Sequence, residues 1–358
     1  MAAEPVRDVP TNVITGPLGA GKTTTIRHLL ARRPPDERWA VLVNEFGEAG
    51  IDGAALVDAS DDLAEVPGGC ICCTAKTQLR VTLTQLLRRV RPHRLLIEPT
   101  GLGHPAGIID MLREPGLAEA IDLQSVIAVF PADGLTEERL AAAPPVRDAF
   151  DLADVLVLNK ADRADPATLE AARALAASAW PAKAGIVVTR QGELDPAWLA
   201  ASARVSRESA TSAACELEAG EAAGHSHDHD HDHDHDHDHD HDHDHGVTES
   251  VEDAAGGFQR LLGGDAEHRA LAWVFPPEVA FAGPALREWF RGLPETVVRA
   301  KGVIRTGPKW QHFSQADGEL SQTESAWRRD SRVELLLAPG TEPDPAWEAG
   351  LLAARQGA

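Results

Sequence analysis

The glycine-rich segment from Gly16 to Thr23 limits the folds open to this chain more than any other feature. It reads Gly-Pro-Leu-Gly-Ala-Gly-Lys-Thr, which satisfies every defined position of the phosphate-binding loop pattern. The preceding run, Thr11–Thr15, has the composition of a short buried strand, and Lys22–Arg32 has that of a helix. A glycine turn that carries a lysine by chance is the alternative. Strand, loop and helix in this order predict a P-loop α/β domain.

The residue types of this loop indicate how it would hold a nucleotide. Glycines allow successive backbone N–H groups to converge on phosphate oxygens, and the helix N-terminus that follows favours negative charge. We expect the Lys22 ammonium to reach the β and γ phosphates and the Thr23 hydroxyl to ligate magnesium. The residues predicted to bind the nucleotide here are Gly16, Gly19, Ala20, Gly21, Lys22, Thr23 and Thr24.

Further β-rich runs alternate with helix-like segments in the N-terminal part of the chain. This alternation predicts a P-loop NTPase fold, in which helices cover both faces of a mostly parallel sheet. Strands are expected at Trp39–Val43, Arg94–Glu98, Ser125–Phe130, Asp154–Asn159 and Gly185–Thr189, and helices at Gln78–Arg91 and Ala167–Ser178.

We expect two folded domains joined by a linker. A P-loop domain is predicted over residues 1–202, a disordered His/Asp-rich linker over 203–264, and a small α+β domain over 265–358. Eleven His and nine Asp lie between His225 and His245 without an apolar face that could support a strand or helix. In the last domain, strands are expected at Leu271–Phe275, Thr296–Ile304 and Arg332–Ala338, and helices at Pro284–Gly292 and Pro345–Arg355.

The net charge of −22 bears on partners rather than on fold. The Asp residues of the tract supply nine of these charges, so the rest of the chain stays acidic. This balance disfavours nucleic acid as a partner. No apolar run approaches the roughly 18 residues of a membrane span, and the N-terminus has no secretory h-region. We therefore expect a cytoplasmic protein without a membrane partner, and composition leaves a homo-oligomer open.

Two predicted strand ends carry further nucleotide chemistry. In the segment Asn159–Asp162, the Asp162 carboxylate can accept hydrogen bonds from guanine N1–H and its amino group, which selects GTP over ATP. In Glu98–Gly101, the Glu98 carboxylate can hold magnesium directly or through water, and the Gly101 N–H can sense the γ-phosphate. An ordinary loop and a solvated glutamate are the alternatives. The predicted catalytic residues are Lys22, Glu98 and Gly101, and the predicted base-site residues are Asn159, Lys160 and Asp162.

Three of the four cysteines lie within four residues, at Cys70, Cys72 and Cys73. In a reducing compartment this spacing favours a metal site over a disulfide. Thiolates suit zinc and, less selectively, cobalt or nickel, but three of them supply only part of a tetrahedral shell. Glu45, Glu48, a water or a client ligand would complete the shell. The alternative is three small residues buried beside the sheet.

The His/Asp tract from His225 to His245 offers many imidazoles with no fixed geometry. We expect it to gather zinc, nickel or copper weakly, and to lose metal on mild acidification because an unperturbed His titrates at about pH 6.5. A solvated linker is the alternative, and the two interpretations are compatible. Our hypothesis is that the tract is a local metal reservoir that feeds the cysteines.

With these motifs in order, the chain resembles the CobW-like GTP-binding metallochaperones of the SIMIBI class, including their C-terminal domain. The resemblance extends over nearly the whole chain except the linker. Its most specific part is Gly69-Cys-Ile-Cys-Cys73 together with the phosphate loop. The matching segments are Thr15–Thr24, Asn44–Glu48 with Ile51-Asp52, Gly69–Cys73, Ile97–Gly101 with Pro105, Asn159–Asp162 and Val298–Gly302.

The resemblance implies a GTPase that uses magnesium, binds a transition metal at the three cysteines and passes it to a client metalloprotein. It also implies that Asn44–Asp52 is a switch segment, with Glu45, Glu48 and Asp52 as neighbours of the metal ions. Three departures from the family pattern are expected to alter switch or client detail rather than nucleotide class. They are Pro17, Thr74–Lys76 and Phe130–Asp133.

We therefore expect a zinc metallochaperone whose metal affinity depends on the GTP state. GTP and magnesium would order the switch segment and Glu98–Gly101, and hydrolysis would release both. One alternative is a cobalt-handling GTPase of cobalamin biosynthesis. Another is a metal-storage or buffer protein that uses the His tract. Nickel insertion, as in hydrogenase or urease maturation, is less favoured by the cysteine motif.

Overall fold

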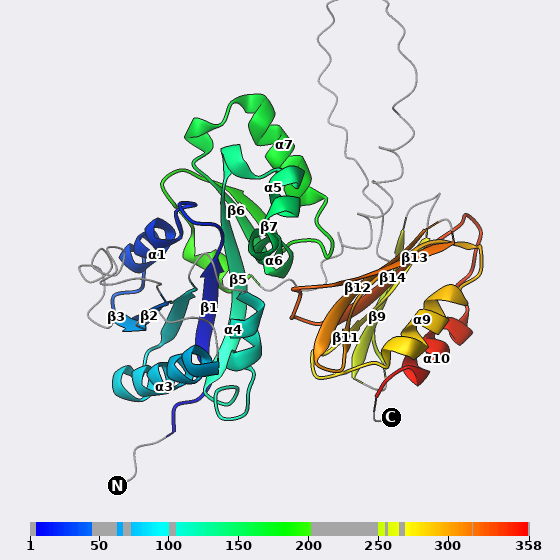
Figure 1. Cartoon of the computed structure of the whole chain (residues 1–358), viewed down its shortest axis with the longest axis horizontal. Helices are drawn as coiled ribbons and strands as arrows, with labels where there is room; N and C mark the ends of the chain where they lie inside the picture. Colours follow the sequence, from blue (N-terminus) through cyan, green and yellow to red (C-terminus); the bar gives the residue numbers. More distant parts are fainter. Residues whose placement is uncertain are drawn as a thin grey trace, which may run out of the picture. The chain divides into compact units, whose positions relative to one another are not determined.

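The computed structural model describes residues 5–44, 63–66, 73–99, 105–201, 250–254, 257–264, 269–316 and 318–356. The chain divides into two compact units, which Figure 1 shows in the colours of the sequence. The first unit comprises Met1–Arg204 with Ala326–Arg328, and the second comprises Val205–Ser325 with Arg329–Ala358. Each unit has its own sheet and its own hydrophobic core.

In the described residues of the first unit, seven strands form one sheet, and all neighbouring strands are parallel. Their order is β3-β2-β4-β1-β5-β6-β7. β6 is buried along its whole length, as expected where both faces of a parallel sheet are covered. This confirms the predicted P-loop α/β fold. The strands are β1 (Val9–Thr15), β2 (Trp39–Asn44), β3 (Leu63–Val66), β4 (Arg94–Glu98), β5 (Ile121–Pro131), β6 (Val155–Asn159) and β7 (Gly185–Val188).

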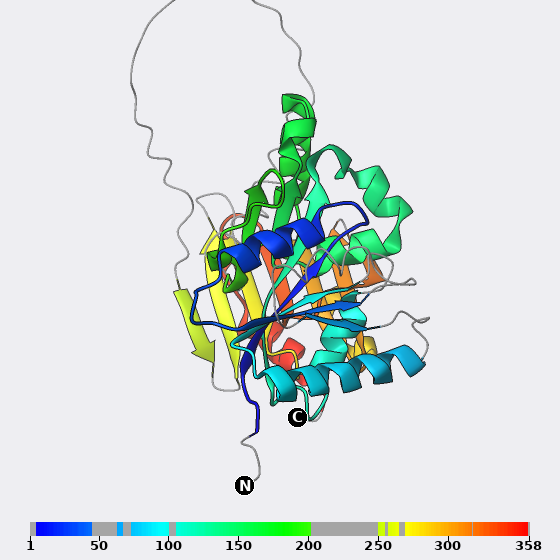
Figure 2. The same ribbon diagram turned by 90° about the vertical axis from the view of Figure 1, so that its left-hand side faces the viewer.

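Helices α1 (Lys22–Ala31) and α3 (Cys73–Val90) pack against opposite faces of this sheet, as Figure 2 shows. Alternation along β5 serves both faces, since Ile127 and Val129 belong to the core under α1 whereas Ala128 belongs to a core on the other side. The remaining helices of this unit are α4 (Pro105–Leu112), α5 (Glu137–Ala142), α6 (Pro144–Leu152) and α7 (Pro166–Ala177), with 3₁₀ turns at Ala132–Gly134, Ala161–Arg163 and Pro196–Leu199.

Helix α3 begins at Cys73, earlier than the predicted start at Gln78. The difference arises because the apolar spacing that marks a helix starts only at Leu79, which is the first described core residue of α3. Of the helices in the described part of the chain, none combines the length and the apolar character that crossing a membrane requires.

The second unit contains an antiparallel sheet whose described strands follow the order β13-β12-β11-β14-β10-β9-β8. Helices α9 (Gly283–Arg291) and α10 (Pro345–Ala353) lie on one face of it (Figure 1). Between that face and the helices, the Phe290 ring stacks on Phe313 with centroids 5.1 Å apart. The strands are β8 (Ser250–Ala254), β9 (Phe258–Gly264), β10 (Arg269–Phe275), β11 (Val297–Thr306), β12 (Lys309–Ala316), β13 (Glu319–Glu324) and β14 (Ser331–Leu337).

Strands β8 and β9 correct the predicted linker boundary at residue 264. They pair with each other, and β9 pairs with β10, so the sheet begins at Ser250. Phe258 and Leu261 of β9 are buried in the structure. The hairpin could not be predicted from the sequence, because glycine and charged residues surround its few apolar positions and weaken the strand pattern.

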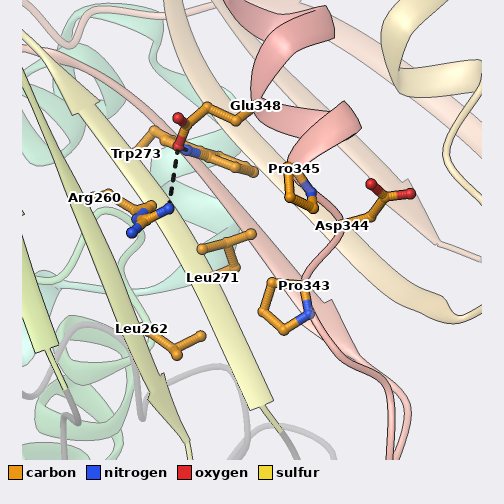
Figure 3. A pocket seen from close by; sticks show the side chains of 8 residues that line it. All are labelled: Arg260, Leu262, Leu271, Trp273, Pro343, Asp344, Pro345 and Glu348. Atoms are coloured by element: carbon orange, nitrogen blue, oxygen red, sulfur yellow. Dashed lines mark hydrogen bonds and ion pairs between the residues drawn. The ribbon is translucent and has the colours of Figure 1, made fainter. Parts of the chain in front are cut away.

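A small pocket in the second unit lies between strands β9 and β10 and the start of α10 (Figure 3). The Trp273 Nε1–H donates to Glu348 Oε2 at 2.8 Å, and Arg260 Nη1 lies 4.0 Å from the same oxygen. The cavity volume of about 150 Å³ is below the usual range of small-molecule sites. Its lining consists of Arg260, Leu262, Leu271, Trp273, Pro343, Asp344, Pro345 and Glu348.

Candidate nucleotide and metal site

The described part of the predicted site lies at the carboxyl ends of three adjacent or near-adjacent strands. Gly16–Thr23 follows β1, Glu98 ends β4, and Asn159 ends β6 with Lys160–Asp162 after it. Parallel strands bring these ends to one edge of the sheet, where α/β proteins bind their ligands. The predicted residues outside the described ranges are Glu45, Glu48, Asp52, Cys70, Cys72 and Gly101, as is the tract from His225 to His245.

The phosphate loop depends on glycine at two close approaches. Gly16 has φ 129°, and a Cβ there would lie 2.1 Å from the Val129 carbonyl oxygen of β5. Gly21 has φ 105°, and a Cβ there would lie 2.3 Å from Asn159 Nδ2. Gly21 is the N-cap of α1, so the capping residue has no side chain that could accept from the first N–H groups of that helix. They remain available for an anion such as phosphate.

A threonine, a lysine and a glutamate meet beside this loop. The Thr23 hydroxyl donates to both carboxylate oxygens of Glu98 at 3.1 Å. The Lys22 ammonium lies 4.0 Å from Glu98 Oε1 and donates to the Pro17 carbonyl at 3.2 Å. Lys22 and Glu98 are both buried, so each charge offsets the cost of burying the other. The hydroxyl and carboxylate oxygens form a hard donor set that fits magnesium.

Asn159 joins the phosphate loop to the base side of the site. Its side chain is buried, with Nδ2 donating to the Ala20 carbonyl at 2.9 Å and Oδ1 accepting from Gly192 N–H at 2.9 Å. Lys160 adopts a left-handed conformation with φ 58°, and its ammonium donates to the Gly19 carbonyl at 2.6 Å. Asp162 is exposed, and no described contact engages its carboxylate. Asn159 and Lys160 thus support the loop, whereas the Asp162 carboxylate has no contact of this kind among the described residues.

The loop after β7 is a part of the site that our sequence analysis missed. Gly192 has φ 72°, and a Cβ there would lie 2.7 Å from the Thr25 backbone nitrogen of α1. The Thr189 hydroxyl donates to the Glu193 carbonyl at 2.7 Å, and the Thr189 carbonyl accepts from Ala161 N–H at 3.1 Å. The glycine at position 192, a few residues after the expected strand, was the available signal for a tight turn here.

A parallel sheet with this loop at its carboxyl edge defines a P-loop nucleotide-binding protein. Residues 10–187 match the family described as "CobW/HypB/UreG, nucleotide-binding domain", and residues 271–349 match "Cobalamin synthesis protein cobW C-terminal domain". The chain belongs to the CobW family, as its motifs predicted.

Individual relatives cover one or both units. The chain is 36% identical over 330 residues to "Zinc chaperone YeiR" of Escherichia coli, an alignment that covers 91% of this chain and 92% of that protein. It is 32% identical over 219 residues to "Zinc chaperone CobW" of Sinorhizobium, covering 53% and 62% of the two chains. Among solved structures, the Zn(II)-bound YjiA GTPase of E. coli matches with 16% identity and a TM-score of 0.43, over 98% of this chain and 100% of that one.

Proposed function

We propose that this protein is a GTP-hydrolysing metallochaperone that binds zinc and transfers it to a client metalloprotein. The observation that supports this best is the meeting of buried Lys22 and Glu98 with the half-buried Thr23 at the phosphate loop. It occurs in a chain that aligns over 91% of its length with a protein named as a zinc chaperone. The first feature suits nucleotide hydrolysis, and the second favours zinc as the cargo.

On the nucleotide side, the residues have distinct roles. Lys22 exchanges its contact with the Pro17 carbonyl for the β and γ phosphates, while Thr23 and Glu98 would hold magnesium. Magnesium, when bound, offsets the phosphate charge. Asp162 would accept hydrogen bonds from guanine, which no adenine can donate in the same arrangement. The proposed Gly101 contact to the γ-phosphate completes this set.

On the metal side, Cys70, Cys72 and Cys73 are the proposed zinc ligands, with Glu48 as a candidate fourth ligand. The described elements on either side support this position. Strand β3 ends at Val66 and α3 begins at Cys73, so the connection that carries the cysteines starts from the carboxyl edge of the sheet. Glu98 ends a strand of the same sheet at that edge. The cysteines would then respond to the γ-phosphate through neighbouring segments.

The tract from His225 to His245 is proposed as an accessory reservoir for zinc, with cobalt and nickel as competitors. Two rival functions remain distinct from the leading one. A cobalt-handling GTPase would share the nucleotide chemistry and differ in cargo, and the description of the matched C-terminal family favours it. A metal buffer would bind through the tract and use its nucleotide only structurally.

GTP turnover in the presence and absence of zinc separates the leading proposal from the buffer. We expect zinc to change the turnover rate of the natural chain and to have no effect on Cys72→Ser. Cys215→Ser is the matched control, because it removes the one cysteine outside the cluster and should respond like the natural chain. Equal zinc effects in the two variants would contradict the proposed cysteine site. Repeating the series with cobalt and nickel ranks the three metals by their effect on GTP turnover.

A further inference from the structure

Arginines gather at the edge of the first unit opposite the nucleotide site. We call this cluster the amino-end arginine patch, because it lies where β2 and β4 begin. The two segments that form it contain no lysine, and their only acids are Asp36 and Glu37. This local excess of positive charge occurs in a chain whose net charge is −22. The patch consists of Arg32, Arg33, Arg38, Arg88, Arg89 and Arg91.

Topology brings these arginines together from two distant parts of the sequence. Helices α1 and α3 end beside the starts of β2 and β4, on opposite faces of the sheet (Figure 2). Backbone contacts then join the segments. His93 N–H donates to the Arg38 carbonyl at 2.8 Å, and Arg38 N–H donates to His93 Nδ1 at 2.9 Å. The Arg38 guanidinium also donates to the Arg91 carbonyl at 3.0 Å.

A helix-capping role accounts for only part of this cluster. Arg33 Nη1 donates to the Leu30 carbonyl at 3.1 Å, which satisfies the end of α1. Arg88 and Arg89 lie in the last turn of α3, where positive charge is favourable. Their side chains are nevertheless exposed, and within the described residues neither makes an ion pair.

Of the two acids in these segments, Glu37 is engaged at the start of β2. Glu37 accepts a hydrogen bond from the Trp39 indole at 2.6 Å, which holds its carboxylate against the start of β2. The guanidinium of Arg94 lies 5.4 Å from the centre of the Trp39 ring and donates to Asn12 Oδ1 at 2.6 Å, so this arginine is structural.

We propose that the amino-end arginine patch docks an acidic segment of a protein partner. Guanidinium groups form bidentate hydrogen bonds with carboxylates, which a lysine surface would not match. Charges are screened beyond about 8 Å at physiological salt, so a short acidic segment interacts mainly with the local patch. A long polyanion such as nucleic acid would also meet the acidic remainder of the chain.

Docking at this edge leaves uncovered the carboxyl edge, where nucleotide and metal are proposed to bind, and in its choice of partner the inference rests on the proposed function. The patch lies at the amino ends of β2 and β4, whereas the phosphate loop lies at the carboxyl end of β1 in the same parallel sheet. A client held at the amino ends would therefore leave the phosphate loop free to exchange nucleotide. The partner in this account is the client metalloprotein, recognised through surface carboxylates.

A fluorescein-labelled hexaglutamate peptide provides the probe. Its fluorescence anisotropy is titrated with the full chain in saturating GDP, so that the phosphate loop is already occupied. We expect Arg88→Gln with Arg89→Gln to weaken binding by roughly tenfold. The matched control, Arg173→Gln with Arg291→Gln, removes two exposed arginines outside the patch and should bind as the natural chain does. Binding by the natural chain should also weaken as salt is raised.

Arg88→Lys with Arg89→Lys tests whether charge or structure is responsible. If the glutamine variant weakens binding through the patch, the lysine variant should recover part of the affinity with the same salt dependence. Equal binding by the patch and control variants would overturn the proposal. So would stronger binding of a single-stranded oligonucleotide or of phosphatidylserine vesicles. GDP and GTP-analogue zinc titrations should be unchanged in the patch variants, which separates this test from that of the proposed function.

Discussion

The carboxyl and amino edges of the parallel sheet in the first unit differ in the burial of their charged and polar side chains. At the carboxyl edge, Lys22, Glu98 and Asn159 are buried: Lys22 lies beside Glu98, and Asn159 bonds the phosphate loop. At the amino edge, Arg88 and Arg89 are exposed. Burial makes the first edge rigid and costly to alter, because each polar group depends on its partner. Exposure makes the second edge sensitive to salt and tolerant of substitution.

The largest expected effect is that of removing the buried lysine of the loop. Lys22→Ala should lower GTP turnover by about 10²–10³-fold, because a positioned positive charge at the phosphates is lost. Lys160→Ala is the matched control, since Lys160 also donates to a loop carbonyl but is not buried. Its turnover should fall far less. Equal losses of turnover in the two variants, measured by phosphate release, would contradict a special role for the buried Lys22.

Substitutions of Asn159 and Asp162 should distinguish a residue that stabilises the site from a residue that recognises the guanine base. Asn159→Ala should lower the free energy of unfolding by about 2–4 kcal/mol, because two buried hydrogen bonds lose their partner. Asp162→Ala should change it by less than about 0.5 kcal/mol, as for other exposed positions.

The same two variants should also differ in their preference for GTP over ATP. Asp162→Ala should lose most of the preference for GTP over ATP, measured as the ratio of the two dissociation constants. Urea unfolding provides the stability values. A strongly destabilised Asp162→Ala with unchanged nucleotide preference would reverse the assignment of these residues.

A substitution of Glu98 tests whether its carboxylate is one of the oxygen donors that bind magnesium. Glu98→Gln should raise the magnesium concentration needed for half-maximal turnover by about tenfold, because the carboxylate charge is lost while its shape is kept. Thr23→Ser keeps the hydroxyl and should respond like the natural chain. A magnesium requirement unaffected by Glu98→Gln would place the metal-side carboxylate elsewhere.

The smallest effect is expected within the amino edge itself. Arg94→Gln should cost about 1–2 kcal/mol of stability, because Arg94 stacks on Trp39 and bonds Asn12. Burial lowers the pKa of Arg94, whereas Glu37 and Asp122 act in the opposite direction, as expected for an enclosed guanidinium. Arg88→Gln should cost less than about 0.5 kcal/mol. Similar losses in thermal unfolding would show that the patch is structural.

Local patterns were sufficient to predict the nucleotide-binding fold. The phosphate loop and the apolar runs that became β1, β4 and β6 carry their structure in adjacent residues. Strand β3 was missed because Leu63–Val66 is too short to show a period. Strands β12 and β13 were also missed. Strand β13 is polar and mostly exposed, and β12 buries only Trp310 and Phe313, so both depend on pairing with their neighbours.

Features that depend on topology were beyond the reach of sequence patterns. The role of Gly192 becomes visible only when the loop after β7 lies against Thr25 of α1. The arginine patch likewise joins segments around Arg38 and Arg91 that the parallel strand order brings to one edge. A glycine can indicate the turn, but neither contact can be predicted from sequence patterns, because each joins segments that are distant in the chain.

The measurement that tests the central claim most directly is zinc affinity in the two nucleotide states. The full chain is titrated with zinc in saturating GDP and in a saturating non-hydrolysable GTP analogue, each with magnesium. We predict tighter zinc binding with the analogue by at least about fivefold, and an equal change in analogue affinity when zinc is bound. Equal zinc affinity in the two states would contradict control of the metal by the nucleotide.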